Sequence, residues 1–287
     1  MKPAPFEYIR PATLPEALAA LAQDEDTTVL AGGQSLVPMM NTRLARPARL
    51  LDINRLPDLD HVRDEGSVIA IGPLARHADI MRDPLVVEHL PLVAEAYEWI
   101  AHSAVRNRGT LAGNLCHADP ASEMPAILQV LGAELVLRSE ADERRVPAEG
   151  FFLGAYETGR RPGELLVEIR IPKPAPGTGH GFEEVAMRKG DYAWAAAVAT
   201  LRVEGGRIAQ ARIAVAGVET RAARLPEAEA ALDGEAPDAA LFAEVARAAA
   251  DGVTPQGSAS AGAEYRRDLV RSLLPRVLAR AAQGGTT

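Results

Sequence analysis

Residues 27–39 read TTVLAGGQSLVPM, a short apolar run followed by two glycines, an amide and a serine. The first four residues, TTVL, are β-branched or apolar and show no helical period, which predicts a buried strand. Glycines directly after a strand let the backbone turn with positive φ and approach a ligand closely. Because successive N–H groups in such a turn can converge into a concave anion site, the sequence predicts an anion-binding loop at residues 31–35.

A second loop of similar chemistry, GTLAGN, follows at residues 109–114 and again combines small residues with a hydroxyl. Two loops of this kind suggest a ligand that carries two phosphates. Neither loop fits G-x-G-x-x-G or G-x-x-x-x-G-K-[ST], so neither the dinucleotide fingerprint of the doubly wound fold nor a P-loop is present. From the loops alone, two ordinary surface turns are an equally good interpretation, because structural glycines are common in turns.

The composition is that of a soluble globular protein: 287 residues, 47% of them hydrophobic, with a mean hydropathy of −0.05. Such a chain is long enough for a sizeable core and for more than one domain. No apolar run approaches the roughly 18 residues that span a bilayer. The start, MKPAPFEYIRPA, lacks the apolar core of a signal peptide, so we expect a cytoplasmic protein. A net charge of −8 without a long basic stripe argues against nucleic acid as a partner.

Cys116 is the only cysteine, which excludes an internal disulfide. A [2Fe–2S] cluster usually needs four thiolates, so this chain is not expected to bind one by itself. No Cys/His spacing is typical of zinc and HExxH is absent, so no metal site is predicted. G-x-S-x-G is missing, and adjacent Cys116 and His117 rarely have catalytic geometry, so no catalytic residue is predicted. Any redox cofactor must therefore be organic or be held by another subunit.

The order of predicted elements divides the chain into two domains. Strands at residues 6–9 and 27–30 flank a helix that begins at the capping box of Thr13 and Glu16. The proline- and glycine-rich segment KPAPGTG (173–179) follows a strand and predicts a linker. We therefore expect a first domain at residues 1–177, with lobes of about 1–56 and 57–177, and a second domain at residues 178–287.

The second domain is predicted to combine three antiparallel strands with helices. The strands are expected at residues 181–188, 193–203 and 207–218, and Gly205 and Gly206 are typical of a two-residue hairpin turn. Alanine-rich segments at residues 222–232, 238–250 and 263–282 predict the helices. The fold class is therefore α+β.

Three side chains near the loops have more than one interpretation. Asp119 and Glu123 flank Pro120, where a helix is expected to begin and negative charge is favoured. That role suffices for Asp119, whereas Glu123 lies just inside the helix and is also placed to accept a hydrogen bond from a ligand hydroxyl. Tyr192 precedes a strand, where it either packs in the core or presents a flat ring to a flat ligand.

Three long segments in order carry a family resemblance. They are AGGQSLVPMMNTRLARPARLLDI (31–53), RNRGTLAGNLCHADPASEMPA (106–126) and GHGFEEVAMRKGDYAWAAAVATL (179–201), and GAEYR (262–266) adds a shorter match. Together they resemble the FAD-binding medium subunit of the molybdenum hydroxylases, the family of xanthine dehydrogenase and aerobic carbon monoxide dehydrogenase, and the carbon monoxide dehydrogenase subunit most of all. The resemblance covers nearly the whole chain. It implies a two-lobed FAD-binding domain of the PCMH type, followed by a C-terminal domain of a three-stranded antiparallel sheet with a helical bundle.

The resemblance also implies roles for individual positions. The two loops would hold the FAD diphosphate with backbone N–H groups, Glu123 would contact FAD, and Tyr192 would lie near the isoalloxazine ring. Ile100 and Leu166 match apolar positions around the flavin. The predicted cofactor-binding residues are Ala31, Gly32, Gly33, Gln34, Ser35, Leu36, Ile100, Thr110, Ala112, Gly113, Asn114, Asp119, Glu123, Leu166 and Tyr192. Where some relatives place a lysine near the flavin, this chain has Glu183 or Glu184, so the effect of that lysine cannot be carried over.

The implied function is electron transfer within an oxidoreductase whose substrate is oxidised on another chain. A large subunit with a molybdopterin cofactor would oxidise the substrate, and a small subunit with two [2Fe–2S] clusters would relay the electrons. FAD on this chain would pass them to an external acceptor, and the family implies a dimer of such heterotrimers. Two alternatives stay open: a self-contained flavin oxidoreductase, and a binding protein for another anionic ligand. No motif names the substrate or the physiological acceptor.

Overall fold

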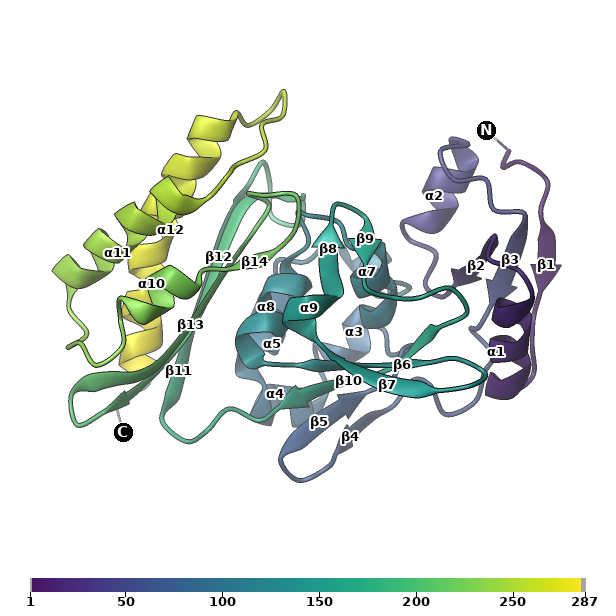
Figure 1. The fold of residues 1–287 in the computed structure, drawn as a ribbon, viewed down its shortest axis with the longest axis horizontal. Helices are drawn as coiled ribbons and strands as arrows, with labels where there is room; N and C mark the ends of the chain where they lie inside the picture. The colour runs from purple at the N-terminus through teal and green to yellow at the C-terminus, as the bar shows by residue number, and fades with distance from the viewer. Residues whose placement is uncertain (1, 285–287) are drawn as a thin grey trace.

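The computed structural model describes residues 2–284 and shows two lobes followed by a unit of one sheet and three helices (Figure 1). The first lobe is a three-stranded parallel sheet with strand order β1-β3-β2. Its elements are β1 (Glu7–Ile9), α1 (Leu14–Gln23), β2 (Thr27–Leu30), α2 (Leu36–Asn41) and β3 (Arg49–Asp52). The predicted β-α-β start is confirmed, and the Thr13 hydroxyl accepts the Glu16 N–H at the start of α1.

The second lobe is an antiparallel sheet of strand order β4-β5-β10-β6-β7, with short helices on one side and a two-stranded sheet of β8 and β9. Its strands are β4 (Val62–Asp64), β5 (Val68–Ile71), β6 (Glu134–Arg138), β7 (Glu143–Pro147), β8 (Phe152–Gly154), β9 (Glu157–Thr158) and β10 (Leu165–Pro172). Its helices are α3 (His77–Ile80), α4 (Pro84–His89), α5 (Pro91–Tyr97), α6 (Ser103–Arg106), α7 (Leu111–His117), α8 (Glu123–Leu131) and α9 (Ala148–Phe151).

The first part of strand β10, Leu165–Val167, is apolar on both faces, because each face packs against a different part of the molecule. Leu166 and Ile169 belong to the core that contains α5 and α8. Leu165 and Val167 point the other way and belong to the core of the first lobe. Both lobes are therefore held to one central strand.

Helix α8 joins the second lobe to the C-terminal domain. Every one of its residues is buried, and a helix that is apolar nearly all round is expected in the centre of a protein. The same core takes in Ala196 and Val198 of the C-terminal sheet. In addition, Gln129 Nε2 donates a hydrogen bond of 3.0 Å to the Ala222 carbonyl.

The C-terminal domain is an antiparallel sheet of strand order β11-β12-β13-β14 with helices on its outer face (Figure 1). Its elements are β11 (Thr178–Ala186), β12 (Ala193–Glu204), β13 (Arg207–Ala216), β14 (Ala223–Arg224), α10 (Pro226–Ala230), α11 (Ala239–Gly252) and α12 (Ala263–Gly284). The hairpin turn is confirmed, with φ of +57° at Gly205 and +77° at Gly206. No helix within residues 2–284 is long and apolar enough to cross a membrane.

The fourth strand corrects the expected three-stranded sheet and the helix predicted to start at residue 222. Ala223 and Arg224 pair with β13, and the helix begins only at Pro226. Pro226 marks the helix start, because a proline fits the first helical position and disfavours helical backbone at the residue before it. Ahead of it, the Arg224 guanidinium binds both oxygens of Glu229 and a carboxylate oxygen of Glu149. These contacts hold the backbone extended where alanine-rich composition favours a helix.

Candidate functional site

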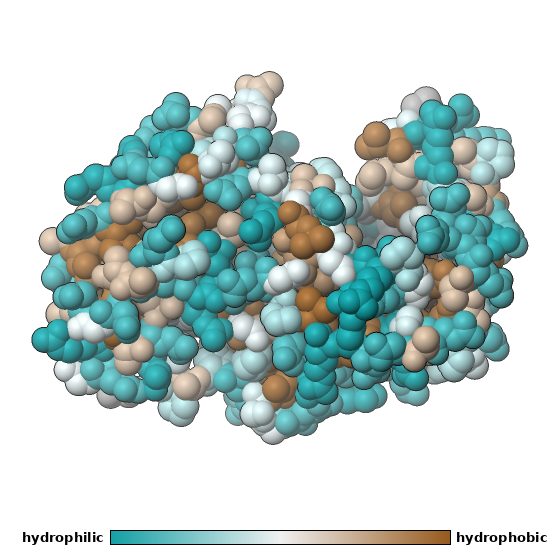
Figure 2. Space-filling model, in the orientation of Figure 1, coloured by the Kyte–Doolittle hydropathy of each residue, from teal (hydrophilic) through white to brown (hydrophobic). Residues whose placement is uncertain are grey.

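A cavity of about 930 Å³ lies between the first lobe and the rest of the molecule, and Figure 2 shows the hollow between these two parts. Cofactor sites typically have volumes of about 300–1,000 Å³. Both glycine loops, residues 31–35 and 109–114, form part of its wall. All predicted cofactor-binding residues except Asp119 line it: Ala31, Gly32, Gly33, Gln34, Ser35, Leu36, Ile100, Thr110, Ala112, Gly113, Asn114, Glu123, Leu166 and Tyr192.

The first glycine loop leaves β2 and enters α2. Gly33 has a φ of +70°, a conformation that side chains with a Cβ rarely adopt. Within residues 2–284, no hydrogen bond engages the backbone N–H groups of Gly32, Gly33, Gln34 and Ser35. Backbone donors in folded proteins are nearly always paired, so a run of free donors in a cavity wall points to an anionic ligand.

The second glycine loop runs into the first turn of α7 and has fewer free donors. The Thr110 hydroxyl accepts the Gly113 N–H at 3.1 Å, and the Thr110 carbonyl accepts the Asn114 N–H at 3.0 Å. The Leu111 N–H also donates to a neighbouring carbonyl. Only the N–H groups of Thr110 and Ala112 therefore remain for a ligand in this loop, as far as residues 2–284 are described.

The two glycine loops touch each other although they belong to different lobes. A Cβ added to Gly32 would overlap the Arg108 carbonyl oxygen and lie 2.7 Å from Gly109 Cα. Only glycine at position 32 permits this approach, because any side chain would force the backbones apart. The loops therefore form one continuous cradle.

Apolar and aromatic side chains form another part of the cavity wall. Ile100 and Leu166 are 5% and 2% exposed, so they are firmly packed where they face the cavity. Tyr192 is 62% exposed, which rules out the core-packing interpretation of this residue. Its ring is available to a flat ligand.

Asp119 serves the turn before α8. Its Oδ1 accepts the Ala121 N–H at 2.9 Å, and its Oδ2 accepts the Tyr156 hydroxyl at 3.2 Å. These contacts agree with the structural role that suffices for this residue. A direct role of Asp119 toward a cofactor stays a prediction.

Glu123 and Glu184 form a buried carboxyl pair. Glu123 begins α8 and lines the cavity, and Glu184 lies on β11; they are 6% and 5% exposed. Neither Glu184 oxygen has a hydrogen-bond donor within residues 2–284. Burial and the charge of Glu184 raise the pKa of Glu123 to about 8, and burial raises the pKa of Glu184 to about 7. Two adjacent buried carboxyls cannot both ionise readily, so the pair retains a proton near neutral pH.

This pair predicts a pH dependence of stability for the FAD-free chain. The folded chain keeps protons that the unfolded chain releases near pH 4.5, so the free energy of unfolding falls as the pH rises from about 4.5 to 8. The slope is on the order of 1 kcal/mol per pH unit for one retained proton. Urea unfolding of wild type and Glu184→Gln at several pH values measures it, and the variant should have the shallower slope. Equal slopes would contradict the retained proton, and Glu183→Gln, which removes a half-buried partner of Arg276 on the same strand, is the matched control.

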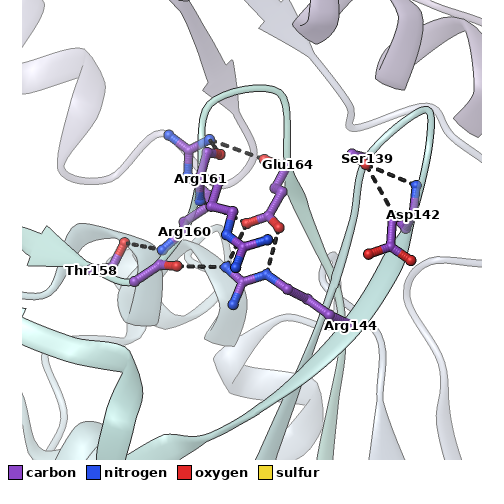
Figure 3. A network of polar contacts seen from close by, with 8 residues as sticks. Ser139, Asp142, Arg144, Thr158, Arg160, Arg161 and Glu164 are labelled. Atoms are coloured by element: carbon purple, nitrogen blue, oxygen red, sulfur yellow. Dashed lines mark hydrogen bonds and ion pairs between the residues drawn. The ribbon is translucent and has the colours of Figure 1, made fainter.

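The structure adds residues that the sequence did not single out. Arg160 and Glu164 line the cavity, and Arg160 Nη1 donates to the Glu164 carbonyl at 3.0 Å. Figure 3 shows the Glu164 carboxylate between the Arg144 guanidinium, at 2.6 and 2.8 Å, and the Arg161 N–H, at 2.7 Å. The composition of this segment, GRRPGE, indicates a turn. Nothing in it reveals that the turn returns to the cavity.

Cys116 and His117 do not form a catalytic pair. Burial raises the pKa of the Cys116 thiol to about 11, so the thiol stays protonated and a poor nucleophile. The His117 ring packs on Tyr156, with ring centroids 5.1 Å apart. Among residues 2–284, no group of three or more His, Cys, Asp or Glu side chains is placed to hold a metal ion.

Comparison with known proteins identifies the family and the fold. A family model described as "FAD binding domain in molybdopterin dehydrogenase" matches residues 4–174, more than half of the chain. The chain belongs to this family. A model described as "CO dehydrogenase flavoprotein C-terminal domain" matches residues 180–281. This FAD-binding medium subunit is thus of the carbon monoxide dehydrogenase-like type, within a family of oxidoreductases, and the predicted family, cofactor and α+β fold class are confirmed.

Relatives match the medium subunit over nearly its full length. The 6-hydroxypseudooxynicotine dehydrogenase complex subunit alpha of Paenarthrobacter nicotinovorans is 40% identical, and the caffeine dehydrogenase subunit beta of Pseudomonas sp. (strain CBB1) is 42% identical. Each comparison covers 98% of this chain and 96% of the relative. A structure of carbon monoxide dehydrogenase from Hydrogenophaga pseudoflava has a TM-score of 0.96 and 40% identity, covering 99% of both chains. The similar identities do not single out one substrate, but the relatives are named as subunits of dehydrogenases.

The cavity of the medium subunit fits FAD on its own geometry. Free N–H groups of the first glycine loop match the charge of a diphosphate, and the close approach at Gly32 forms a cradle of backbone only. Ile100, Leu166 and Tyr192 suit a flat, largely apolar ring.

Proposed function

We propose that this medium subunit holds FAD between its lobes and transfers electrons through it, from [2Fe–2S] clusters of a small partner subunit to an external acceptor. The observation that carries the proposal is the cavity, which combines unpaired backbone donors in one part of its wall with apolar side chains in another. FAD, when bound, supplies the redox chemistry, because it exchanges electrons both with single-electron centres and with two-electron acceptors.

The chain's own residues bind and orient the cofactor. N–H groups of Gly32 and its neighbours donate to phosphate oxygens, and those of Thr110 and Ala112 complete the cradle. Ile100 and Leu166 exclude water from the ring, which keeps local electrostatic interactions strong. Glu123 offers a carboxyl group that burial keeps protonated near neutral pH, so it can donate as well as accept a hydrogen bond.

The substrate reaction is proposed to belong to other subunits. The single cysteine supports this division, because two [2Fe–2S] clusters need more thiolates than the chain has. Molybdopterin would lie on a large subunit, and the assembly would be a dimer of heterotrimers. In this proposal residues 1–177 are the FAD-binding domain, with lobes of about 1–56 and 57–177, and residues 178–287 form the second domain.

Purified alone and incubated with FAD, the chain is expected to bind the flavin stoichiometrically. It should accept electrons from a chemical reductant and return them to an artificial acceptor, yet oxidise none of the candidate substrates carbon monoxide, caffeine or 6-hydroxypseudooxynicotine. Absorption spectra measure the bound flavin, and dye reduction measures turnover. Affinity purification of the tagged chain from its native host should add iron, molybdenum and two further chains.

The two alternatives give different results in the same experiments. Substrate turnover by the chain alone would indicate a self-contained flavin oxidoreductase. A colourless chain that rejects added FAD would indicate a binding protein for another anion. Either result overturns the proposal.

A further inference from the structure

Two polar side chains that do not line the cavity connect the glycine loops. Asn54 follows β3 in the first lobe, and Arg76 follows β5 in the second. Asn54 Nδ2 donates to the Ala31 carbonyl at 2.8 Å, and Asn54 Oδ1 accepts from Arg76 Nη2 at 2.7 Å. Arg76 Nη1 donates to the Arg108 carbonyl at 2.5 Å. One chain of hydrogen bonds therefore runs from the first loop to the residue that precedes the second.

These bonds act on peptide groups that set the direction of loop donors. In a trans peptide, the carbonyl and the following N–H point in opposite directions. When Asn54 holds the Ala31 carbonyl, it turns the Gly32 N–H the other way, and that N–H is one of the free donors of the cradle. On the other side, the backbone of Arg76 pairs with Thr110 as an isolated antiparallel bridge.

Further hydrogen bonds and partial burial hold the Asn54 and Arg76 side chains in place. Asn54 Nδ2 also donates to Asp52 Oδ1 at 2.7 Å, and Asp52 Oδ2 accepts the Tyr8 hydroxyl at 2.5 Å. Arg76 is half-buried, and burial together with the charge of Arg108 lowers its pKa. Hydrogen bonds from a partly desolvated guanidinium are shorter and stronger than those between neutral groups. The polar contacts therefore fix a distance between the lobes and do not merely satisfy surface groups.

We propose that Asn54 and Arg76 form a brace that sets the spacing and orientation of the two glycine loops, and that both are positioning residues for the FAD diphosphate. The brace complements the contact at Gly32, where the loops touch without any polar bond. The inference rests on the proposed function, in which both loops bind the diphosphate.

The test measures the affinity of the full-length chain for FAD and for ADP, which carries the diphosphate without the flavin. Arg76→Met and Asn54→Ala are each expected to weaken both affinities by about 10- to 100-fold. The double variant should bind no more weakly than the weaker single variant, because both changes break the same chain of bonds. Phosphorus resonances of the residual bound FAD should shift in each variant, since the phosphates lose their fixed environment.

Arg280→Met is the matched control for a purely structural effect. Arg280 also bridges a carbonyl and a side chain, donating to Phe182 O at 3.0 Å and to Glu95 Oε1 at 2.7 Å, but it does not line the cavity. Its loss should change thermal stability and leave FAD affinity within about twofold. If Arg76→Met does not fold, Arg76→Lys replaces it: lysine keeps the charge but cannot span both partners, so it should still weaken binding.

The outcomes separate the brace from the proposed function. If the wild-type chain binds FAD and both Arg76→Met and Asn54→Ala keep its affinities for FAD and ADP, the brace is overturned and the proposed function stands. So would an equal loss of affinity in Arg280→Met. A wild-type chain that binds neither FAD nor ADP would overturn the proposed function, and the brace with it.

Discussion

A chain with Gly32→Val is expected to fold and to lose FAD, with an affinity lower by about 100-fold or more. A side chain at this position would overlap the Arg108 carbonyl and crowd Gly109, so the two glycine loops must separate. Separation costs both the contact between the loops and the geometry of the free N–H groups, roughly 3 kcal/mol in total. Flavin absorbance after gel filtration and circular dichroism together measure the loss of cofactor and the retention of fold.

Two further glycines calibrate this effect. At Gly150 in α9 an added Cβ would meet nothing within 4 Å, so Gly150→Val should retain FAD. At Gly113 the Cβ would meet only the Thr110 hydroxyl at 2.9 Å, a side-chain atom that can rotate away at the cost of its capping bond to the Gly113 N–H. Gly113→Val should therefore weaken FAD binding less than Gly32→Val. Full FAD content in Gly32→Val would show that the loops do not form the cradle.

Arg144→Ala is expected to destabilise the chain by about 2–3 kcal/mol, because it removes charge-assisted hydrogen bonds from a carboxylate in a partly buried ion pair. Burial alone would raise the pKa of Glu164, yet hydrogen bonds from Arg144 and the Arg161 N–H lower it, so the carboxylate is ionised and depends on these donors. Without Arg144, the Glu164 carboxylate, whose side chain is 7% exposed, keeps only the Arg161 N–H as a hydrogen-bond donor. Denaturant unfolding measures the loss. FAD affinity should fall as well, since the turn that carries Arg160 lines the cavity.

The neighbouring Arg145 provides the control. It pairs with Glu134 at 3.8 Å, with side chains that are 57% and 46% exposed, so Arg145→Ala should cost no more than about 1 kcal/mol. The double variant Arg144→Met, Glu164→Leu should recover much of the lost stability, because an apolar pair needs no donors. Equal effects of Arg144→Ala and Arg145→Ala would contradict the buried-pair explanation.

The sequence predicted the parts of the site that are local in the chain. Each glycine loop is marked by a few small residues beside a hydroxyl, and the first also follows a short apolar strand, so both loops could be located, although their residues alone fitted a surface turn equally well. The same holds for the hairpin turn at Gly205, where two glycines fix the backbone by themselves. The conformation of these segments depends on residues that are adjacent in the sequence, so it can be predicted from hydrophobic periodicity and turn composition.

Features that depend on pairing between distant segments could not be predicted in this way. Glu184 shows no sign in its own segment that it meets Glu123, and Arg160 shows no sign that its turn returns to the first lobe. Alanine-rich composition also does not show that Ala223 is extended, because its pairing with Val215 of β13 is a distant contact; only Pro226 marks locally where the helix begins. In each case the tertiary contact overrides or adds to the local preference.

The hydrophobic cores on the two faces of β10 group the parts of the molecule differently from the linker at residues 173–179, which separates the second lobe from the C-terminal domain. The inner face of β10 and α8 place the second lobe and the C-terminal sheet in one hydrophobic core, so these two parts should unfold and exchange amide hydrogens as a single cooperative unit. The first lobe packs on the outer face of the strand through a smaller core, to which the second lobe contributes Val136, Leu165 and Val167, so we expect it to open at a lower cost. Such an opening would part the two glycine loops, which gives FAD a route of entry. We therefore expect cofactor loading to follow the opening of the first lobe, and bound FAD to slow hydrogen exchange there first.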